Sequence, residues 1–492
     1  MNAVSDKAAR QAAVVAALRT CLPPSAILWN EEDTRPFECD GLSAYRELPM
    51  VVALPDSEEQ VRAILRTCRD MQVPVVARGA GTGLSGGALP HAAGVLLSLA
   101  KFKRILSLDP VARTARVQPG VRNLAISEAA VQYGLYYAPD PSSQIACSIG
   151  GNVAENSGGV HCLKYGLTVH NILRVRACTI DGDVLEIGNA GLDAAGYDLL
   201  ALITGSEGML AVITEITVKL LPRPECAQVM LAAFASVHQA GEAVANIIAA
   251  GIIPAGLEMV DQQMARAVEP FVHAGYPLDA AAILLCESDG SKGEVAEEIA
   301  RMHEVMQASG ATEIRVSGSE AERLRLWAGR KAAFPAVGRI SPDYYCMDGT
   351  IPKKRLAEAL DGIAAMEKKY GLRCANVFHA GDGNLHPLIM YDANVEGELK
   401  RTEQFGAEIL ELCVALGGTI TGEHGVGIEK INQMCVQFCP DELEVFHAVK
   451  HAFDAPGLLN PGKAVPTLAR CAEFNAMHVH GGKLAHPDLP RF

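Results

Sequence analysis

A loop with five glycines in nine residues, 79–87, constrains this chain more than any other part of its sequence. It follows the apolar run Val73–Val76, which is typical of a buried strand. Backbone without side chains leaves N–H groups free to face an anion, and such a nest suits a diphosphate. Residues 81–86 also match the G-x-G-x-x-G pattern of a Rossmann loop, but that loop opens directly into a helix. Glycines and a proline interrupt residues 87–94, so the pattern favours a dinucleotide loop between two strands over a Rossmann loop or a purely structural one.

The segments around this loop indicate an α+β chain. Ser57, with Gln60 three residues later, forms a capping box that predicts the start of a helix. After the loop, short β-rich runs between 94 and 118 precede a helix near 121–133, without the steady alternation of a βαβ protein. Two prolines within residues 222–224 disfavour both a helix and a central strand, so we expect a domain boundary there.

Charge and cysteine content argue against several classes of protein. The formal net charge of -14 disfavours nucleic acid as a partner. No long apolar run and no signal-peptide pattern is present, so we expect a cytoplasmic protein without a transmembrane segment. The 14 cysteines are scattered, so we expect reduced thiols and no disulfide. No C-x-x-C pair occurs, so an iron–sulfur centre that accepts electrons would belong to another subunit.

Two further segments offer small residues and hydroxyl groups. Residues 139–142 lead to a run at 148–159 with four glycines, and Gly205–Gly208 precedes an expected strand at 210–218. An extended cofactor requires more than one such segment to contact it along its length. The two glycine-rich segments therefore favour a bound dinucleotide over structural turns.

The order of these three segments resembles the FAD-binding domain of the vanillyl-alcohol-oxidase type of flavoproteins. The resemblance implies an α+β fold with a two-part FAD-binding domain, an α+β substrate domain and a C-terminal helical segment. Some relatives attach the flavin covalently to a histidine at a place near Thr82, so non-covalent FAD is implied. The first loop would hold the diphosphate, and the second would lie along the flavin ring and the ribityl chain. The residues implied to bind FAD are Arg78, Gly79, Ala80, Gly81, Thr82, Gly83, Leu84, Ser85, Pro139, Asp140, Ser142, Ser148, Gly150, Gly151, Asn152, Asn156, Gly158, Gly205, Glu207, Gly208, Ile213 and Asn460.

Two histidines flank a predicted β-hairpin. If Asp382-Gly383 is a two-residue type I′ turn, His379 lies directly opposite His386. Opposed Cβ atoms are about 4.5–5.5 Å apart, close enough for two imidazoles to share one metal ion. Two hydrogen-bonding histidines are the alternative. Glu423 and His424 lie side by side between glycines, and two histidines with one carboxylate make an open site for a divalent ion.

These segments resemble the C-terminal domain of FAD-linked D-2-hydroxyacid dehydrogenases. By that likeness His379, His386 and Glu423 bind a divalent metal, Zn or Mn, and His424 is the base. Arg330 corresponds to the arginine that holds the substrate carboxylate, for which a bidentate guanidinium is suited. A solvated helix arginine is the alternative for this residue.

The likeness spans about residues 45–465 and is nearest to the flavoprotein subunits of bacterial glycolate oxidases. Relatives that act on dicarboxylic hydroxy acids carry a lysine near Cys346, which this chain lacks. A small 2-hydroxy acid is therefore implied, glycolate in preference to D-lactate, oxidised by metal-assisted proton abstraction and hydride transfer to FAD. The implied partners are an iron–sulfur subunit and a second flavoprotein-like subunit, through which the chain would dock at the inner face of the membrane.

We expect a helical lead-in (1–45), an FAD-binding domain (46–224), a substrate and metal domain (225–431), a helical segment that returns to the FAD domain (432–466) and a tail (467–492). The alternative functions are a stand-alone D-lactate dehydrogenase, a non-catalytic flavin-binding scaffold subunit and a non-haem iron oxygenase. His161-Cys162 and the tail histidines His478, His480 and His486 are weaker ligand candidates, because the first pair suits packing and the others lie near the terminus.

Overall fold

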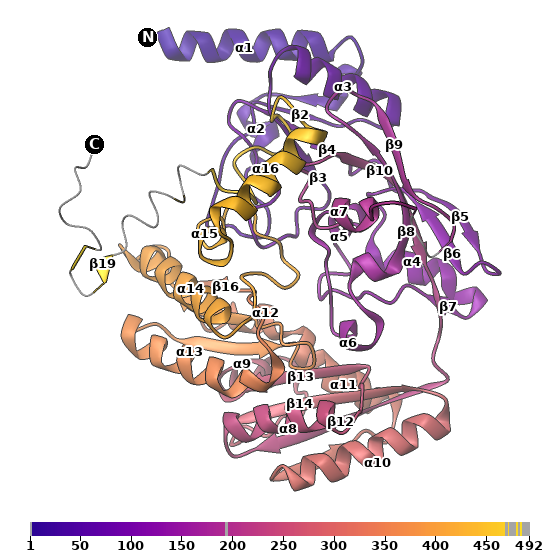
Figure 1. Ribbon diagram of the computed structural model, residues 1–492, viewed down its shortest axis with the longest axis vertical. Helices are drawn as coiled ribbons and strands as arrows, with labels where there is room; N and C mark the ends of the chain where they lie inside the picture. The colour runs from indigo at the N-terminus through magenta and orange to yellow at the C-terminus, as the bar shows by residue number, and fades with distance from the viewer. Residues whose placement is uncertain (1, 192–194, 468–470, 472–478, 481–482, 485–492) are drawn as a thin grey trace.

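The computed structural model describes residues 2–191, 195–467, 471, 479–480 and 483–484. Two sheets lie in the N-terminal half, drawn indigo to magenta in Figure 1, and one larger sheet lies in the half drawn magenta to orange. Parallel pairing occurs in the first sheet, and the larger sheet is antiparallel. This mixture of sheets and helices confirms the α+β class.

The first sheet has four strands in the order β1 (Ile27–Leu28), β2 (Val51–Ala53), β4 (Val95–Ser98), β3 (Val75–Arg78). Its neighbouring helices are α1 (Asn2–Leu18), η1 (Pro24–Ala26), α2 (Glu31–Thr34), η2 (Arg35–Phe37) and α3 (Glu58–Asp70). The Ser57 hydroxyl accepts a hydrogen bond from the Gln60 N–H, so the predicted helix start is confirmed. The side chains of Val61, Ile64 and Leu65 are fully buried, because α3 presents this apolar face to the sheet.

The glycine-rich loop joins β3 to β4, which lie side by side and parallel. Parallel neighbours are usually connected by a helix. Residues 79–94 make this connection without helix, as expected from the glycines and the proline. The Rossmann alternative is therefore excluded, and the loop leaves its backbone uncovered at the end of β3.

The second sheet is antiparallel, with strands β5 (Ile105–Asp109), β6 (Thr114–Val117), β10 (Val212–Lys219), β8 (Ile172–Cys178) and β9 (Val184–Gly188). The segments between its strands form α4 (Asn123–Ala130), η3 (Val131–Tyr133), α5 (Ile149–Glu155), α6 (Cys162–Tyr165), η4 (Thr168–Asn171) and α7 (Leu199–Ile203). A short pair joins β7 (Leu135–Tyr136) to β11 (Leu221–Pro222), and β11 ends within the predicted domain boundary at Pro222.

The third sheet has seven strands, β15 (Glu313–Val316), β12 (Cys226–Phe234), β14 (Ala282–Gly290), β13 (Gly256–Asp261), β17 (Cys374–Phe378), β18 (Pro387–Tyr391) and β16 (Asp343–Cys346). Alternate residues of its strands face two separate cores, as the period of two requires. Met230 and Ala232 of β12 pack with α8 (Val237–Ala249), α10 (Lys292–Ala308), α13 (Leu356–Tyr370) and α14 (Glu398–Ala415). Val229 and Leu231 pack on the other face with α9 (Gln262–Val272), α11 (Glu320–Lys331) and α12 (Ala333–Val337). A short η5 (Lys353–Arg355) precedes α13.

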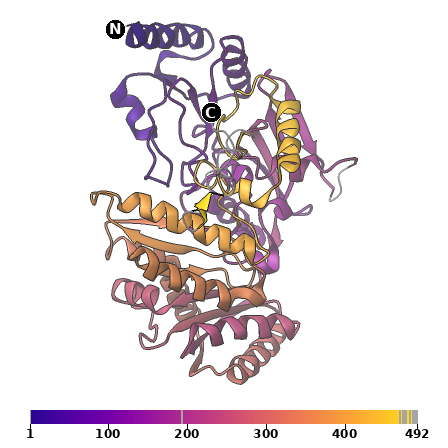
Figure 2. The same cartoon turned by 60° about the vertical axis from the view of Figure 1, so that its left-hand side comes forward.

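The C-terminal segment crosses back to the first sheet. It forms α15 (Met434–Gln437) and α16 (Pro440–Phe453), and α16 lies beside the N-terminal half in both Figure 1 and Figure 2. Leu459 then bridges to Val75 of β3, and the Asn460 amide donates to the Gly87 carbonyl at 2.9 Å. Residues distant in sequence thus support the glycine-rich loop. A last hairpin consists of β19 (Val479–His480) and β20 (Lys483–Leu484), whereas His478 and His486 lie outside the described residues.

The expectation that the chain has no disulfide is wrong. Cys435 of α15 is bonded to Cys471, with Cα atoms 5.3 Å apart. The two residues are 36 positions apart, and only the turn of the chain after α16 brings them together. Their spacing in the sequence carries no sign of this contact, and the other described cysteines are free.

His161 joins the two halves of the molecule through charge. Its Nδ1 lies 2.9 Å from an oxygen of Asp140, and its Nε2 lies 3.2 Å from an oxygen of Glu287 on β14. Burial alone would lower the pKa of His161, but the two carboxylates raise it to about 10. Nearby, Lys164 forms an ion pair with Asp289 of the same strand at 2.6 Å. His161 is thus a charged bridge between the halves, and not the packing residue that the sequence suggested.

Replacing His161 by glutamine should lower the melting temperature most at pH 6. The native pKa is about 10 and the unfolded pKa is about 6.5, so the imidazolium stabilises the fold fully below pH 6.5 and loses this effect as the pH rises through 10. We expect a Tm deficit of at least about 1 °C at pH 6, the shift for roughly 1 kcal/mol in a chain of this length, and a smaller one at pH 10. Circular dichroism at both values measures it, with the exposed His238→Gln as control. An equal deficit at both pH values would contradict the charged bridge.

Candidate functional site

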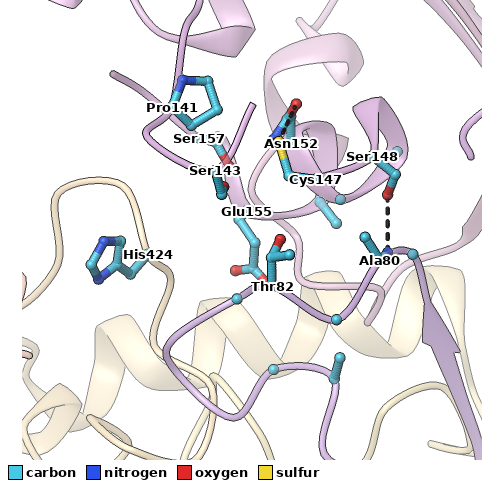
Figure 3. Close-up of a pocket in the computed structure, with 18 of the residues that line it drawn as sticks. Ala80, Thr82, Pro141, Ser143, Cys147, Ser148, Asn152, Glu155, Ser157 and His424 are labelled. Atoms are coloured by element: carbon cyan, nitrogen blue, oxygen red, sulfur yellow. Dashed lines mark hydrogen bonds between the residues drawn. The ribbon is translucent and has the colours of Figure 1, made fainter. Parts of the chain in front are cut away.

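The three glycine-rich segments meet around one cavity of about 370 Å³. Figure 3 shows Ala80 and Thr82 of the first loop facing Ser143, Ser148 and other residues of the second segment. The predicted cofactor residues that line the cavity are Arg78, Gly79, Ala80, Gly81, Thr82, Gly83, Leu84, Ser142, Ser148, Gly150, Gly151, Asn152, Glu207, Gly208 and Ile213. Most of the predicted cradle is therefore gathered at one place.

The other predicted cofactor residues lie outside the lining and support it: Ser85, Pro139, Asp140, Asn156, Gly158, Gly205 and Asn460. The Ser85 carbonyl accepts from the Ile428 N–H at 3.0 Å, and the Asn156 side chain accepts from the Val169 N–H at 2.9 Å. Asn460 donates to the Glu207 carbonyl at 2.6 Å. These contacts tie the walls of the cavity to the surrounding chain.

The first glycine-rich loop and the start of α5 are in direct contact. The Ser148 hydroxyl, at the start of α5, accepts a hydrogen bond from the Ala80 N–H at 3.2 Å (Figure 3). A Cβ atom at Gly79 would overlap that hydroxyl and displace it. Glycine at this position therefore preserves the hydrogen bond between the two segments.

Residues of the C-terminal half line the remaining side of the cavity. His386, Glu423 and His424 line the same cavity as the glycine loop, and His379 lies behind them. The imidazoles of His386 and His424 are stacked, with ring centroids 4.8 Å apart, and that of His379 is 5.1 Å from His386. The predicted base and the predicted metal ligands therefore meet at one edge of the cavity.

The register predicted for the histidine hairpin is wrong. His379 pairs with Asn384 and Asn376 with Pro387, so four residues, 380–383, form the turn. A type I′ turn needs positive φ at both central residues, and only Gly383 has it, at 83°. His386 is consequently the diagonal neighbour of His379 and not its direct partner. Diagonal residues share a face of the ladder, so the two imidazoles still meet.

The spacing of the donor atoms fits a metal ion. His379 Nε2 and His386 Nε2 lie 3.2 and 3.3 Å from the same Glu423 oxygen. Two ligand atoms about 2.1 Å from one ion, at angles of roughly 90–110°, are about 3.0–3.4 Å apart. His386 Nε2 is buried and has no hydrogen bond of good geometry to a described residue, so a bound cation would give it a partner. His379, His386 and Glu423 therefore suit a divalent cation.

Glu258 orients the first of these ligands. One of its oxygens lies 2.7 Å from His379 Nδ1, and the other lies 2.6 Å from Arg330 Nε. A carboxylate that holds the second nitrogen of a ligating histidine sets its tautomer and its direction. Arg330 is almost fully buried in this contact and does not line the cavity, whereas the adjacent Lys331 does.

Asp348 holds the loop that carries Glu423 and His424. Its carboxylate accepts the backbone N–H groups of residues 422, 423 and 424, and it lies 3.0 Å from the Lys430 ammonium. Burial opposes ionisation, yet Lys430 and nearby histidines hold the pKa of Asp348 well below its usual range. The result is a buried carboxylate in a nest of backbone amides.

His424 is neutral at physiological pH. Burial lowers its pKa to about 4, and its Nδ1 makes no hydrogen bond to a described residue. A neutral imidazole is the form that accepts a proton.

Sequence patterns did not reveal the roles of Glu258, Asp348, Lys430 or Lys331. The only available signal was a charged residue within a strongly apolar segment, as at Glu258 in the fully buried β13. Such residues are rarely buried without a partner, but the partner is distant in sequence.

Two family models match the chain: an FAD binding domain over residues 49–188, and the C-terminal domain of FAD linked oxidases over residues 223–464. The chain is 64% identical to glycolate oxidase subunit GlcD of Escherichia coli strain K12, across 97% of this chain and 96% of that one. It is 38% identical to glycolate oxidase subunit GlcD of Bacillus subtilis, across 88% and 93%. A D-lactate dehydrogenase of Anaerostipes hadrus is 31% identical, across 90% and 95%.

Solved structures share the fold at low sequence identity. p-Cresol methylhydroxylase superposes with a TM-score of 0.79 at 17% identity, across 94% of this chain and 98% of that one. 4-Ethylphenol oxidase from Gulosibacter chungangensis gives 0.77 at 16% identity, with the same coverage. These neighbours confirm the vanillyl-alcohol-oxidase type of fold.

Replacing Asp348 by asparagine should lower the free energy of unfolding by about 3–5 kcal/mol, because it leaves the buried Lys430 ammonium without its carboxylate. Urea unfolding followed by circular dichroism measures the change. The double variant D348N/K430M should lose less than the sum of the single losses. Glu31→Gln, in an exposed ion pair with Arg35, is the control and should change stability by less than about 1 kcal/mol. A loss in D348N no larger than that of the control would contradict this role of Asp348.

Proposed function

Because the chain belongs to the family of FAD-linked oxidases, we propose that it oxidises glycolate to glyoxylate. It is an FAD-dependent 2-hydroxyacid oxidoreductase. One observation carries the choice of site: the glycine cradle and the His386, Glu423 and His424 cluster line the same cavity. A substrate in that cavity touches the base while it faces the flavin.

The residues around the cavity have separate tasks. His379, His386 and Glu423 would hold Zn or Mn, an ion that suits two imidazoles and one carboxylate. When bound, FAD supplies a two-electron acceptor and the divalent ion supplies Lewis acidity. His424 removes the hydroxyl proton of the substrate on a ring nitrogen. Glu258 fixes the direction of His379, and Asp348 fixes the loop that carries His424.

The substrate carboxylate binds to a cation at the edge of the cavity. Likeness to relatives gives this task to Arg330, but its guanidinium is buried against Glu258 and does not line the cavity. Lys331, the next residue, does line it, so we assign the carboxylate contact to the Lys331 ammonium. A fixed carboxylate directs the C2 hydrogen at the flavin, because only one orientation then satisfies both ends of a two-carbon acid.

We also propose that an iron–sulfur subunit and a second flavoprotein-like subunit accept the electrons. The sequence contains no C-x-x-C pair, and two of its relatives are named as subunits of glycolate oxidase. No helix in the described part of the chain is long and apolar enough to cross a membrane. The proposed location is the cytoplasm, with docking at the inner face of the membrane through those partners.

Replacement of His424 by alanine should lower turnover about 10²–10⁴-fold, the usual effect of losing a general base. Turnover is measured with an artificial electron acceptor, and anaerobic bleaching of the flavin absorbance by glycolate, D-lactate and L-lactate is compared in wild type and variant. Glycolate should bleach wild type fastest. Faster bleaching by D-lactate would favour the D-lactate dehydrogenase alternative, and unchanged turnover in the variant would favour the scaffold alternative.

Removal of the metal should abolish turnover and leave the flavin bound. A chelator takes the ion from three buried donors, whereas the glycine cradle does not depend on it. Turnover should return on addition of Zn²⁺ or Mn²⁺ but not Mg²⁺, which prefers oxygen ligands. Metal analysis and the visible spectrum are recorded at each step. Full activity in protein without metal would exclude the assisted mechanism.

A further inference from the structure

Glu155 places a carboxyl group in the cavity that no described residue satisfies. It is the last residue of α5, and its side chain points into the cavity beside Thr82 (Figure 3). Its Oε2 is buried and has no hydrogen-bond partner among the described residues. A Cβ atom at Gly87 would lie 2.7 Å from Oε1, and one at Gly425 would overlap Oε2. The carboxyl group therefore lies between the glycine loop and the loop of the base.

The charges around Glu155 favour its neutral form. Glu207 is its nearest acidic neighbour, and both Glu207 oxygens accept backbone N–H groups, from residues 426 and 427 at 2.7 Å. Burial raises the pKa of Glu207 as well, but these two bonds oppose that shift, and Glu155 has no such bonds. Two adjacent buried carboxylates cannot both be ionised at low cost, so the proton is favoured on Glu155. Burial, and then Glu207 and Asp40, raise the pKa of Glu155 well above its usual range.

The nearby cations are already engaged. Lys430 is paired with Asp348 at 3.0 Å, and Lys463 donates to the Gly87 carbonyl at 3.0 Å and to the Asn460 side chain at 2.7 Å. No ion pair in the described part of the chain includes Glu155. A carboxylic acid without a cation keeps its proton and presents one O–H donor.

We propose that Glu155 is a neutral acid whose O–H donates a hydrogen bond to the flavin half of bound FAD. A buried polar group without a partner is costly, and here the cofactor is the partner that completes it. The flavin half is favoured over the diphosphate because the carboxyl group packs against Gly425, next to His424, and hydride transfer requires the flavin ring close to that base. This inference rests on FAD binding and the position of His424, and it does not depend on which hydroxy acid is oxidised.

A neutral donor at this place affects the reduction of the cofactor. Reduction adds electron density to the ring, which an ionised carboxylate would repel and an O–H group stabilises. Loss of the donor should therefore lower the midpoint potential of the bound flavin.

The experiment compares Glu155→Gln, which keeps a neutral donor of similar shape, with Glu155→Ala, which removes it. Glu429→Gln is the matched control, because Glu429 is also a buried carboxyl group without a hydrogen-bond partner but does not line the cavity. For each protein we would measure the FAD dissociation constant, the visible spectrum and the midpoint potential with reference dyes. None of these requires a hydroxy acid, so their outcome is independent of the proposed substrate.

E155A should bind FAD about tenfold more weakly, the upper range for one hydrogen bond, with a shifted spectrum and a lower potential. E155Q and E429Q should stay within about twofold of wild type. Equal losses in E155Q and E155A would overturn the neutral donor. Weaker binding with unchanged spectrum and potential would place the contact on the diphosphate and overturn the flavin assignment.

If E155A does not fold, infrared spectra decide between the two protonation states of Glu155. A protonated carboxyl band present in wild type and absent in E155Q supports the proposal, and its absence from wild type overturns it.

Discussion

Two buried carboxylates, one from each half of the molecule, hold the loop on which the site depends. Asp348 accepts the N–H groups of residues 422–424, and Glu207 accepts those of residues 426 and 427. Glu423, the proposed metal ligand, and His424, the proposed base, are thus fixed by backbone contacts to the substrate half and to the FAD half together. A shift of one half against the other would break hydrogen bonds made by buried carboxyl groups, which is costly in a low dielectric.

Buried charged groups also join the two halves elsewhere along their contact. His161 bridges Asp140 and Glu287, and Lys164 pairs with Asp289. Buried charge pairs contribute less to net stability than apolar packing, but they tolerate fewer alternative arrangements. We interpret this contact as one that specifies geometry, since a flavin and a base on different halves must meet at a defined distance. Glu155 and Glu429 are the exceptions, because each lacks a hydrogen-bond partner for at least one buried oxygen.

Predictions from short sequence segments were correct where neighbouring residues determine the local structure. The capping of α3 by Ser57 and the course of the glycine loop follow from neighbouring residues. The register of the histidine hairpin failed, because Asp382-Gly383 satisfies the composition of a type I′ turn while the chain forms a four-residue turn. The disulfide between Cys435 and Cys471 and the burial of Arg330 against Glu258 depend on distant segments, and no spacing rule reports them.

Short sequence segments are enough to indicate the class of cofactor site and the chemical groups available to it. Glycines that leave amides uncovered, and the types of side chain at His379, His386, Glu423 and His424, are properties of such segments. The folded chain sets which of these groups share one cavity, which imidazole nitrogens lack a hydrogen-bond partner among the described residues, and which carboxyl groups are ionised. Those properties depend on burial and on charges brought together from residues hundreds of positions apart, and electrostatic energies in a buried site are set by distance in space, not by order in the chain.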